Sequence, residues 1–293
     1  MEIDKENNGI AFNDKAHKYW DVNDSKKKFI SVTTLIEKFG QPFNKDFWSA
    51  YKALEKLIPA ENWKVEKKSL LNTQKFDKSI LDLYDISEDE FNKTQQDILD
   101  EWQKTNQEAC ERGTKIHSEL ENSFYKMGAN CTLKKFGIGG KFVCKKNYNK
   151  LDLENGVYPE YLISRVSKDG ILCLAGQIDV LVKHGNHITI IDHKTNSKID
   201  TKGFFNSKTK TTTKMKYPLN KLDDCNYSHY NLQLSTYAWM VQMMCPGTEV
   251  DDLILNHYDH DGNNTIYHMP YLKTEVIKML SYYKKQRIHE LQE

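Results

Sequence analysis

Two acidic residues interrupt apolar, β-branched segments in the middle of the sequence. Asp179 closes the segment 176–179 (Gly-Gln-Ile-Asp), and Asp192 lies within the segment 190–194 (Ile-Ile-Asp-His-Lys). If the two segments form a hairpin that turns at residues 185–186, their carboxylates lie on neighbouring strands, with Cβ atoms about 5 Å apart. Two carboxylates this close repel each other unless they share a cation. Carboxylate oxygens suit Mg²⁺ or Mn²⁺, so the sequence predicts a divalent metal site.

Lys194 follows Asp192 by two residues, and strand alternation therefore places both side chains on the same face. An ammonium group beside a bound water and a phosphate can orient the nucleophile and stabilise developing negative charge. An Asp-X-Lys motif alone is more often a solvent-exposed ion pair at a strand end. Its combination with a preceding Gly-X-X-Asp motif is far more restrictive and favours a catalytic site.

Two helical segments carry further polar residues at one-turn spacing. His117 and Glu121 share a helical face, and Gly113 on the same face leaves room for a ligand. A neutral imidazole would add a nitrogen ligand, which favours Mn²⁺ as well as Mg²⁺. Gln233 and Tyr237 are also one turn apart and could hydrogen-bond a phosphate or a carboxylate. Taken singly, each of these pairs is more often part of an ordinary amphipathic helix.

Together, in this order, the motifs resemble those of the PD-(D/E)XK nuclease superfamily. The closest resemblance is to its RecB-like exonuclease branch, which includes phage exonucleases and the mitochondrial genome maintenance exonuclease. It covers about residues 105–245 and rests on a Gly-Thr-X-X-His helix, Gly-X-X-Asp and Asp-X-Lys strands and a Gln-X-X-X-Tyr helix. The matching residues are Gly113, Thr114, His117, Gly176, Asp179, Asp192, Lys194, Gln233 and Tyr237.

The resemblance implies a role for each of these positions. The metal ligands would be His117, Asp179, Asp192 and the backbone carbonyl of His193. The catalytic residues would be Lys194, Asp179, Asp192, Gln233 and Tyr237. Supporting residues would be Glu160, on the preceding strand where many members keep a glutamate, together with Glu121, Gly113 and Thr114. Iron–sulphur members of the branch carry a late cysteine cluster. Cys225 and Cys245 lack partners at that spacing, so we predict no such cluster.

The activity implied is that of a metal-dependent deoxyribonuclease with Mg²⁺ or Mn²⁺ as cofactor. Exonuclease action is favoured because the branch contains mostly exonucleases. The expected setting is DNA processing in recombination, replication or repair, of the phage type, in the cytoplasm (the host's, if the chain is phage-encoded). Two alternatives stay open: an endonuclease of the same fold, and a catalytically inactive DNA-binding or assembly protein. Cleavage polarity, strand preference and oligomeric state are left open.

Composition excludes several other classes of protein. The 293 residues contain 42 Lys plus Arg and 41 Asp plus Glu, a net charge of +1, which excludes a histone-like or ribosomal protein. We expect no membrane association, because no apolar run is long enough to cross a bilayer and the N-terminus lacks an export signal. The six cysteines form no Cys-X-X-Cys pair, so free thiols are expected.

Lysines gather in two stretches, residues 132–150 and 198–221. Such local basic charge on a nearly neutral chain predicts a phosphate-binding surface, although solvated lysine-rich loops are an equal alternative. The candidate DNA-binding residues are Arg112, Lys134, Lys135, Lys208, Lys210, Lys214 and Lys216.

The elements that must hold these residues follow from the apolar periodicity. We predict an α/β fold with a central mixed β-sheet flanked by helices, a restriction-endonuclease-like core, and an N-terminal strand/helix extension. Residues 1–104 would form this extension, a hairpin and helices, and residues 105–293 the nuclease core. The core sheet should contain a three-stranded meander at 156–166, 171–184 and 187–194. Helices are expected at 45–58, 61–84, 94–127, 229–244 and from residue 274. Gly113 should mark a break or a close backbone approach in the third of these.

Overall fold

A computed structural model describes residues 5–7, 9–13, 16, 18–24, 27–145, 153–206 and 209–292. The chain forms two compact units: residues 1–41, 113–206 and 211–293 make the first, and residues 42–112 and 207–210 the second. The sequence-based division into an extension (1–104) and a nuclease core (105–293) follows the expected function, and it stays a prediction.

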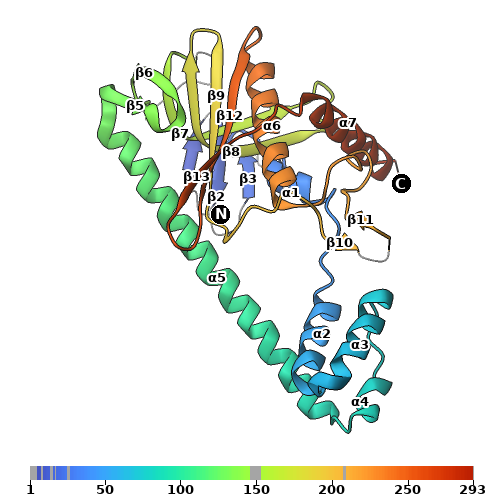
Figure 1. The fold of residues 1–293 in the computed structure, drawn as a ribbon. Coiled ribbons are helices and arrows are strands. Elements are labelled where there is room, and N and C mark those ends of the chain that lie inside the picture. The colour runs from blue at the N-terminus through green and yellow to red at the C-terminus, as the bar shows by residue number, and fades with distance from the viewer. Residues whose placement is uncertain are drawn as a thin grey trace. The chain divides into compact units, whose positions relative to one another are not determined.

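The first unit contains a six-stranded mixed β-sheet, which confirms the predicted α/β class (Figure 1). The predicted meander corresponds to three antiparallel neighbours with β8 in the middle. Parallel pairing joins β9 to β12 and β8 to β4, and β13 pairs antiparallel with β12. The strands are β4 (Ile30–Ser31), β7 (Gly156–Val166), β8 (Cys173–His184), β9 (His187–Lys194), β12 (Glu249–Tyr258) and β13 (Asn264–His268).

Both faces of the sheet are buried, and this is why its central strands read as nearly continuous apolar runs. Helices α1 (Val32–Glu37), α6 (Asn226–Met244) and α7 (Lys273–Glu290) contribute to the core on one face, together with Ile190. The next residue, Ile191, packs on the opposite face with Phe124 and other apolar side chains. The alternation of β-strand side chains therefore separates two hydrophobic layers.

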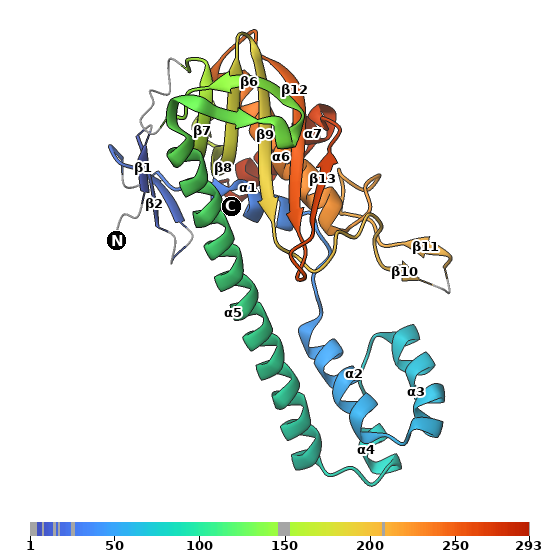
Figure 2. The same ribbon diagram turned by 60° about the vertical axis from the view of Figure 1, so that its left-hand side comes forward.

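Smaller elements complete the first unit. Figure 2 shows a small N-terminal sheet beside the central sheet. Its side chains Ile10, Phe12 and Tyr19 pack against Leu162 and Ala175 of the central sheet. Its strands are β1 (Lys5–Asn7), β2 (Ile10–Asn13) and β3 (Lys18–Asp21). The remaining elements are the 3-10 helices η1 (Gly128–Asn130) and η2 (Lys134–Phe136), and the paired strands β5 (Cys131–Leu133) with β6 (Ile138–Phe142) and β10 (Phe205–Asn206) with β11 (Thr211–Thr212).

The second unit is helical and has its own core. It contains α2 (Lys45–Leu57), α3 (Ala60–Thr73), α4 (Ser79–Leu83) and residues 88–112 of α5 (Glu88–Met127). Its buried side chains include Tyr51, Leu54, Trp63, Phe91 and Ile98.

Two helix predictions need correction. The single helix predicted over 61–84 is wrong, because α3 ends where Gln74 adopts a left-handed backbone with φ of 49°. The expected break at Gly113 does not occur, since α5 is one helix through this position. The group that approaches Gly113 is the side chain of Thr195, whose Oγ1 would lie 3.5 Å from an added Cβ. In the part of the chain that the structure describes, no helix is long and apolar enough to cross a bilayer.

Candidate metal centre

Three acidic residues form one row across the central sheet where two of its strands diverge. The ladder between β8 and β9 ends at Val180 and Ile191. One step further along this register, Asp179 lies opposite Asp192. On the other edge of β8, the register with β7 places Glu160 opposite Asp179. Carboxylates from three adjacent strands are thus brought together at the end of the pairing.

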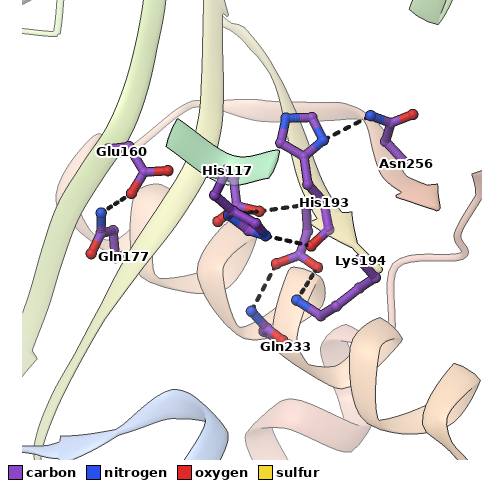
Figure 3. Close-up of polar contacts among 9 residues, drawn as sticks. His117, Glu160, Gln177, His193, Lys194, Gln233 and Asn256 are labelled. Atoms are coloured by element: carbon purple, nitrogen blue, oxygen red, sulfur yellow. Dashed lines mark hydrogen bonds and ion pairs between the residues drawn. The ribbon is translucent and has the colours of Figure 1, made fainter. Parts of the chain in front are cut away.

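His117, Glu160 and Asp179 form a group that could hold a metal ion. Each offers one ligand atom, and these atoms lie within 4.8 Å of one another. The His117 Nδ1 atom lies 3.5 Å from Asp179 Oδ2, and its Nε2 atom donates to the carbonyl of His193 at 3.0 Å (Figure 3). Because a carbonyl only accepts hydrogen bonds, a neutral imidazole carries its proton on Nε2 and turns the Nδ1 lone pair toward the carboxylates.

The surroundings favour this neutral imidazole. Burial first, and then the positive charge of Lys194, lower the pKa of His117 below its ordinary value, although nearby carboxylates oppose the shift. At neutral pH the ring is therefore uncharged and able to act as a nitrogen ligand.

Both carboxylates of the group are held by neighbouring donors. The backbone N–H of His193 donates to Asp179 Oδ2 at 2.6 Å, and the side-chain amide of Gln177 donates to Glu160 (Figure 3). Glu160 also has a left-handed backbone, with φ of 51°, although it lies within a strand. This conformation costs a non-glycine residue about 1–2 kcal/mol.

Asp192 has a different environment, because both of its oxygens are engaged. Its side chain is buried, with Lys194 Nζ 2.5 Å from Oδ2 and Gln233 Nε2 donating to Oδ1 at 2.8 Å (Figure 3). Burial alone would lower the pKa of Lys194, but the charges of Asp192 and Asp179 outweigh it, and the pKa is raised. The lysine is therefore an ammonium ion, and its Nζ also lies 5.0 Å from the ring centre of Tyr230.

Helix α6 approaches the site through a contact that only glycine permits. A Cβ atom on Gly176 would lie 2.5 Å from Cε1 of Tyr237 and 2.9 Å from its hydroxyl oxygen. Tyr237 is buried, and burial raises its pKa well above the ordinary value, so the hydroxyl stays protonated. The glycine of the Gly-X-X-Asp motif is thus explained by packing of β8 against α6.

A cavity of about 620 Å³ joins these groups. The sequence-predicted residues that line it are Gly113, Thr114, His117, Glu121, Glu160, Gly176, Asp179, Lys194, Gln233 and Tyr237. Asp192 contacts Lys194 and is not among the lining residues. A ligand role for Asp192 would use the lone pairs that its contacts with Lys194 and Gln233 leave on its oxygens. The His193 carbonyl accepts from His117 and likewise keeps a second lone pair for a ligand role. Both roles stay predictions.

Sequence reasoning missed several residues of the cavity. Phe12, Tyr19, Ser31 and Thr33 reach it from the N-terminal segment, and Ser118 and Gln177 lie beside predicted residues. It also missed Asn256, whose side-chain amide donates to His193 Nδ1 at 2.8 Å (Figure 3). Asn256 is fully buried in β12, and an amide that directly follows the apolar run 253–255 is a signal that could have identified it.

Among the predicted DNA-binding residues that the structure describes, none lines this cavity. Lys135 Nζ lies 2.5 Å from the Tyr258 hydroxyl, and Lys214 pairs with Asp223 at 3.0 Å. Arg112 and Lys210 belong to the second unit, and Lys208 lies outside the described residues. The remaining predicted residues, Lys134 and Lys216, are exposed. Their role in DNA binding stays a prediction.

No protein-family model and no curated protein matches this sequence. Two solved structures are distantly similar. The first, SSO0001, aligns over 44% of this chain with 18% identity and a TM-score of 0.25, and the chain spans 50% of its length. The second, described as a candidate exonuclease from Eubacterium rectale, aligns over 90% of this chain and 81% of its own, with 10% identity and a TM-score of 0.34. Similarity this distant assigns no family, so the functional argument rests on the site.

Proposed function

We propose that this chain is a Mg²⁺- or Mn²⁺-dependent nuclease that hydrolyses phosphodiester bonds in DNA. The observation that carries the proposal is the group formed by His117, Glu160 and Asp179 in a cavity that also contains the Lys194 ammonium. One neutral imidazole and two carboxylates form a nitrogen/oxygen donor set that these ions accept.

The residues of the site divide the work between binding and charge stabilisation. When bound, a divalent ion would offset the phosphate charge and make a nearby water more acidic. Lys194 stabilises the negative charge that develops on the attacked phosphate, because its ammonium lines the cavity. Asp192 holds this lysine in place, Gln233 holds Asp192, and the His193 N–H orients Asp179.

Exonuclease action is the finer form of the proposal. It is supported by the motif order and spacing that the sequence shares with the RecB-like exonuclease branch. On this basis we assign the enzyme to DNA processing in recombination, replication or repair.

The test is cleavage of end-labelled linear DNA with Mn²⁺, with and without EDTA. The wild-type chain should shorten the DNA only with Mn²⁺, and both Asp179→Asn and Lys194→Met should lower the rate at least about a hundredfold. Matched controls are Asp261→Asn and Lys273→Met, two exposed positions that do not line the cavity.

The outcomes distinguish the alternatives. Full activity in both site variants, or cleavage that survives EDTA, would refute the proposal. Binding of DNA without any cleavage would select an inactive DNA-binding protein. Closed circular DNA should stay intact, whereas linearisation of the circle would select an endonuclease.

A further inference from the structure

A second cavity, of about 410 Å³, lies between α7 and the segment 217–222. It shares no lining residue with the metal centre. Its walls are fixed to the core. The backbone N–H of Leu272, at the start of α7, donates to Ser235 Oγ of α6 at 3.0 Å, and Leu219 within the segment is buried. We call this cavity the α7 groove.

Positive charge dominates the α7 groove. Lys221, Lys278 and Lys285 line it and are exposed, whereas Glu275 is its one acidic lining residue among those described. Lys278 and Lys285 lie on the same face of α7, with Tyr282 between them at one-turn spacing. The groove therefore offers several ammonium groups along one line, which suits a chain of phosphates.

An exposed aromatic ring lies beside these lysines. The Tyr217 side chain is 66% exposed. Its ring is supported edge-on by Tyr282, with centroids 5.2 Å apart at an interplanar angle of 78°. Tyr282 in turn packs edge-on against the buried Phe39, with centroids 6.1 Å apart. The outer ring is thus held in a fixed orientation with an accessible surface.

We propose that the α7 groove binds single-stranded DNA, with one base stacked on Tyr217 and adjacent phosphates at Lys221, Lys278 and Lys285. Unpaired bases expose the flat faces that an aromatic ring can stack on, whereas bases inside a duplex are already stacked on each other. The inference rests on the proposed function, because it takes DNA as the polymer that the chain handles. It adds a binding site for an unpaired strand outside the metal centre.

The test measures the anisotropy of a fluorescent oligothymidylate in EDTA, where no cleavage occurs. Tyr217→Leu should weaken binding by roughly fivefold to a hundredfold, the effect of losing one stacked base, while Tyr217→Phe should bind like the wild type. Lys278→Gln should reduce the slope of log affinity against log salt by about 0.7, the value for one phosphate contact on a single strand.

The control is Lys273→Gln, an exposed lysine on α7 outside the groove. It should leave the affinity and the salt slope unchanged, and a blunt hairpin duplex should bind Tyr217→Leu as well as the wild type. Unchanged single-strand binding by both groove variants would overturn the proposal. An equal loss of single-strand affinity in Lys273→Gln would also overturn it. So would an equal loss of duplex affinity in Tyr217→Leu.

Failure of this inference can be distinguished from failure of the proposed function. Cleavage of a very short oligonucleotide with Mn²⁺ should be equal in the wild type and the groove variants, because they retain the metal group. If the wild type cleaves the oligonucleotide and the groove variants bind the single strand normally, only the α7 groove proposal is refuted. A wild type that does not cleave refutes the nuclease, while weaker binding by Tyr217→Leu would still support the groove.

Discussion

Glu160 combines a strained backbone conformation with a proposed role as a metal ligand. Its left-handed φ of 51° is a conformation that glycine adopts without steric cost, yet the position holds a carboxylate beside His117 and Asp179. Strain of this kind persists where the surrounding structure holds the residue in place, and it is concentrated at functional sites. We therefore expect stability and metal binding to oppose each other at this position.

Replacing Glu160 with glycine should separate the two. Glu160→Gly relieves the left-handed strain. The greater freedom of glycine in the unfolded chain and the lost hydrogen bond from Gln177 offset this gain, so the free energy of unfolding in EDTA should change by no more than about 1 kcal/mol. Mn²⁺ affinity should fall at least about tenfold, because a ligand is lost. Urea denaturation and calorimetric titration measure the two quantities. Glu160→Gln is the control: it should lose Mn²⁺ affinity without a gain in stability, and a clear loss of stability in Glu160→Gly would contradict the account.

The buried pair of Asp192 and Lys194 makes a second prediction at the residue scale. Asp192→Asn keeps the shape of the side chain but leaves Lys194 without the negative charge 2.5 Å away. Breaking a buried pair in this way should lower the free energy of unfolding by about 3 kcal/mol, measured by urea denaturation. Asp169→Asn, which removes the exposed partner of Lys284, should lower the free energy of unfolding much less. Equal losses of stability in the two variants would show that the buried pair contributes no more than the exposed one.

At the scale of elements, the contact of β8 with α6 depends on a missing side chain. In Gly176→Ala the new methyl group would overlap the Tyr237 ring, and the resulting displacement should cost about 1–3 kcal/mol of stability. Thermal or urea unfolding would measure the loss. Adding Tyr237→Leu should recover part of it by removing the ring. If the double variant is no more stable than Gly176→Ala, steric overlap is not the cause.

The turn between β7 and β8 is joined to α7 by the ion pair of Asp169 and Lys284, and this pair should depend on pH. Lys284, followed by the Ser167 hydroxyl, lowers the pKa of Asp169 to about 2. Because the folded pKa is depressed, the stabilisation is present above the unfolded value of about 3.9 and is lost as the pH falls toward 2. The stability difference between wild type and Asp169→Asn should therefore be smaller at pH 3 than at pH 6, as measured by urea midpoints. A difference that does not change with pH would contradict this assignment.

Local sequence signals predicted the elements that short-range rules determine. The hairpin turn at residues 185–186 sets the register of β8 and β9, so the sequence alone predicts that Asp179 lies near Asp192. The end of α3 was missed because Gln74, rather than glycine or proline, takes the left-handed position. The lining residues Phe12, Tyr19, Ser31 and Thr33 were missed for another reason. Their positions depend on long-range contacts with the central sheet, such as the parallel pairing of β4 with β8, which leave no local signal in the sequence.

At the scale of the whole molecule, two units with separate cores share one chain. The metal group and the α7 groove both belong to the first unit, so one compact unit carries the proposed chemistry and the proposed strand binding. The motif residues that the sequence singled out do converge there. Spacing alone does not show which carboxylate Lys194 contacts. In the structure Lys194 contacts Asp192, and the group that could hold a metal ion consists of His117, Glu160 and Asp179.

The most direct measurement of the central claim is anomalous X-ray diffraction from crystals of the chain grown with Mn²⁺. We predict a single strong peak within coordination distance of the His117 imidazole and the Glu160 and Asp179 carboxylates, and no peak in crystals of Asp179→Asn. A wild-type map without a peak among these three side chains, or with its manganese bound elsewhere, would contradict the account.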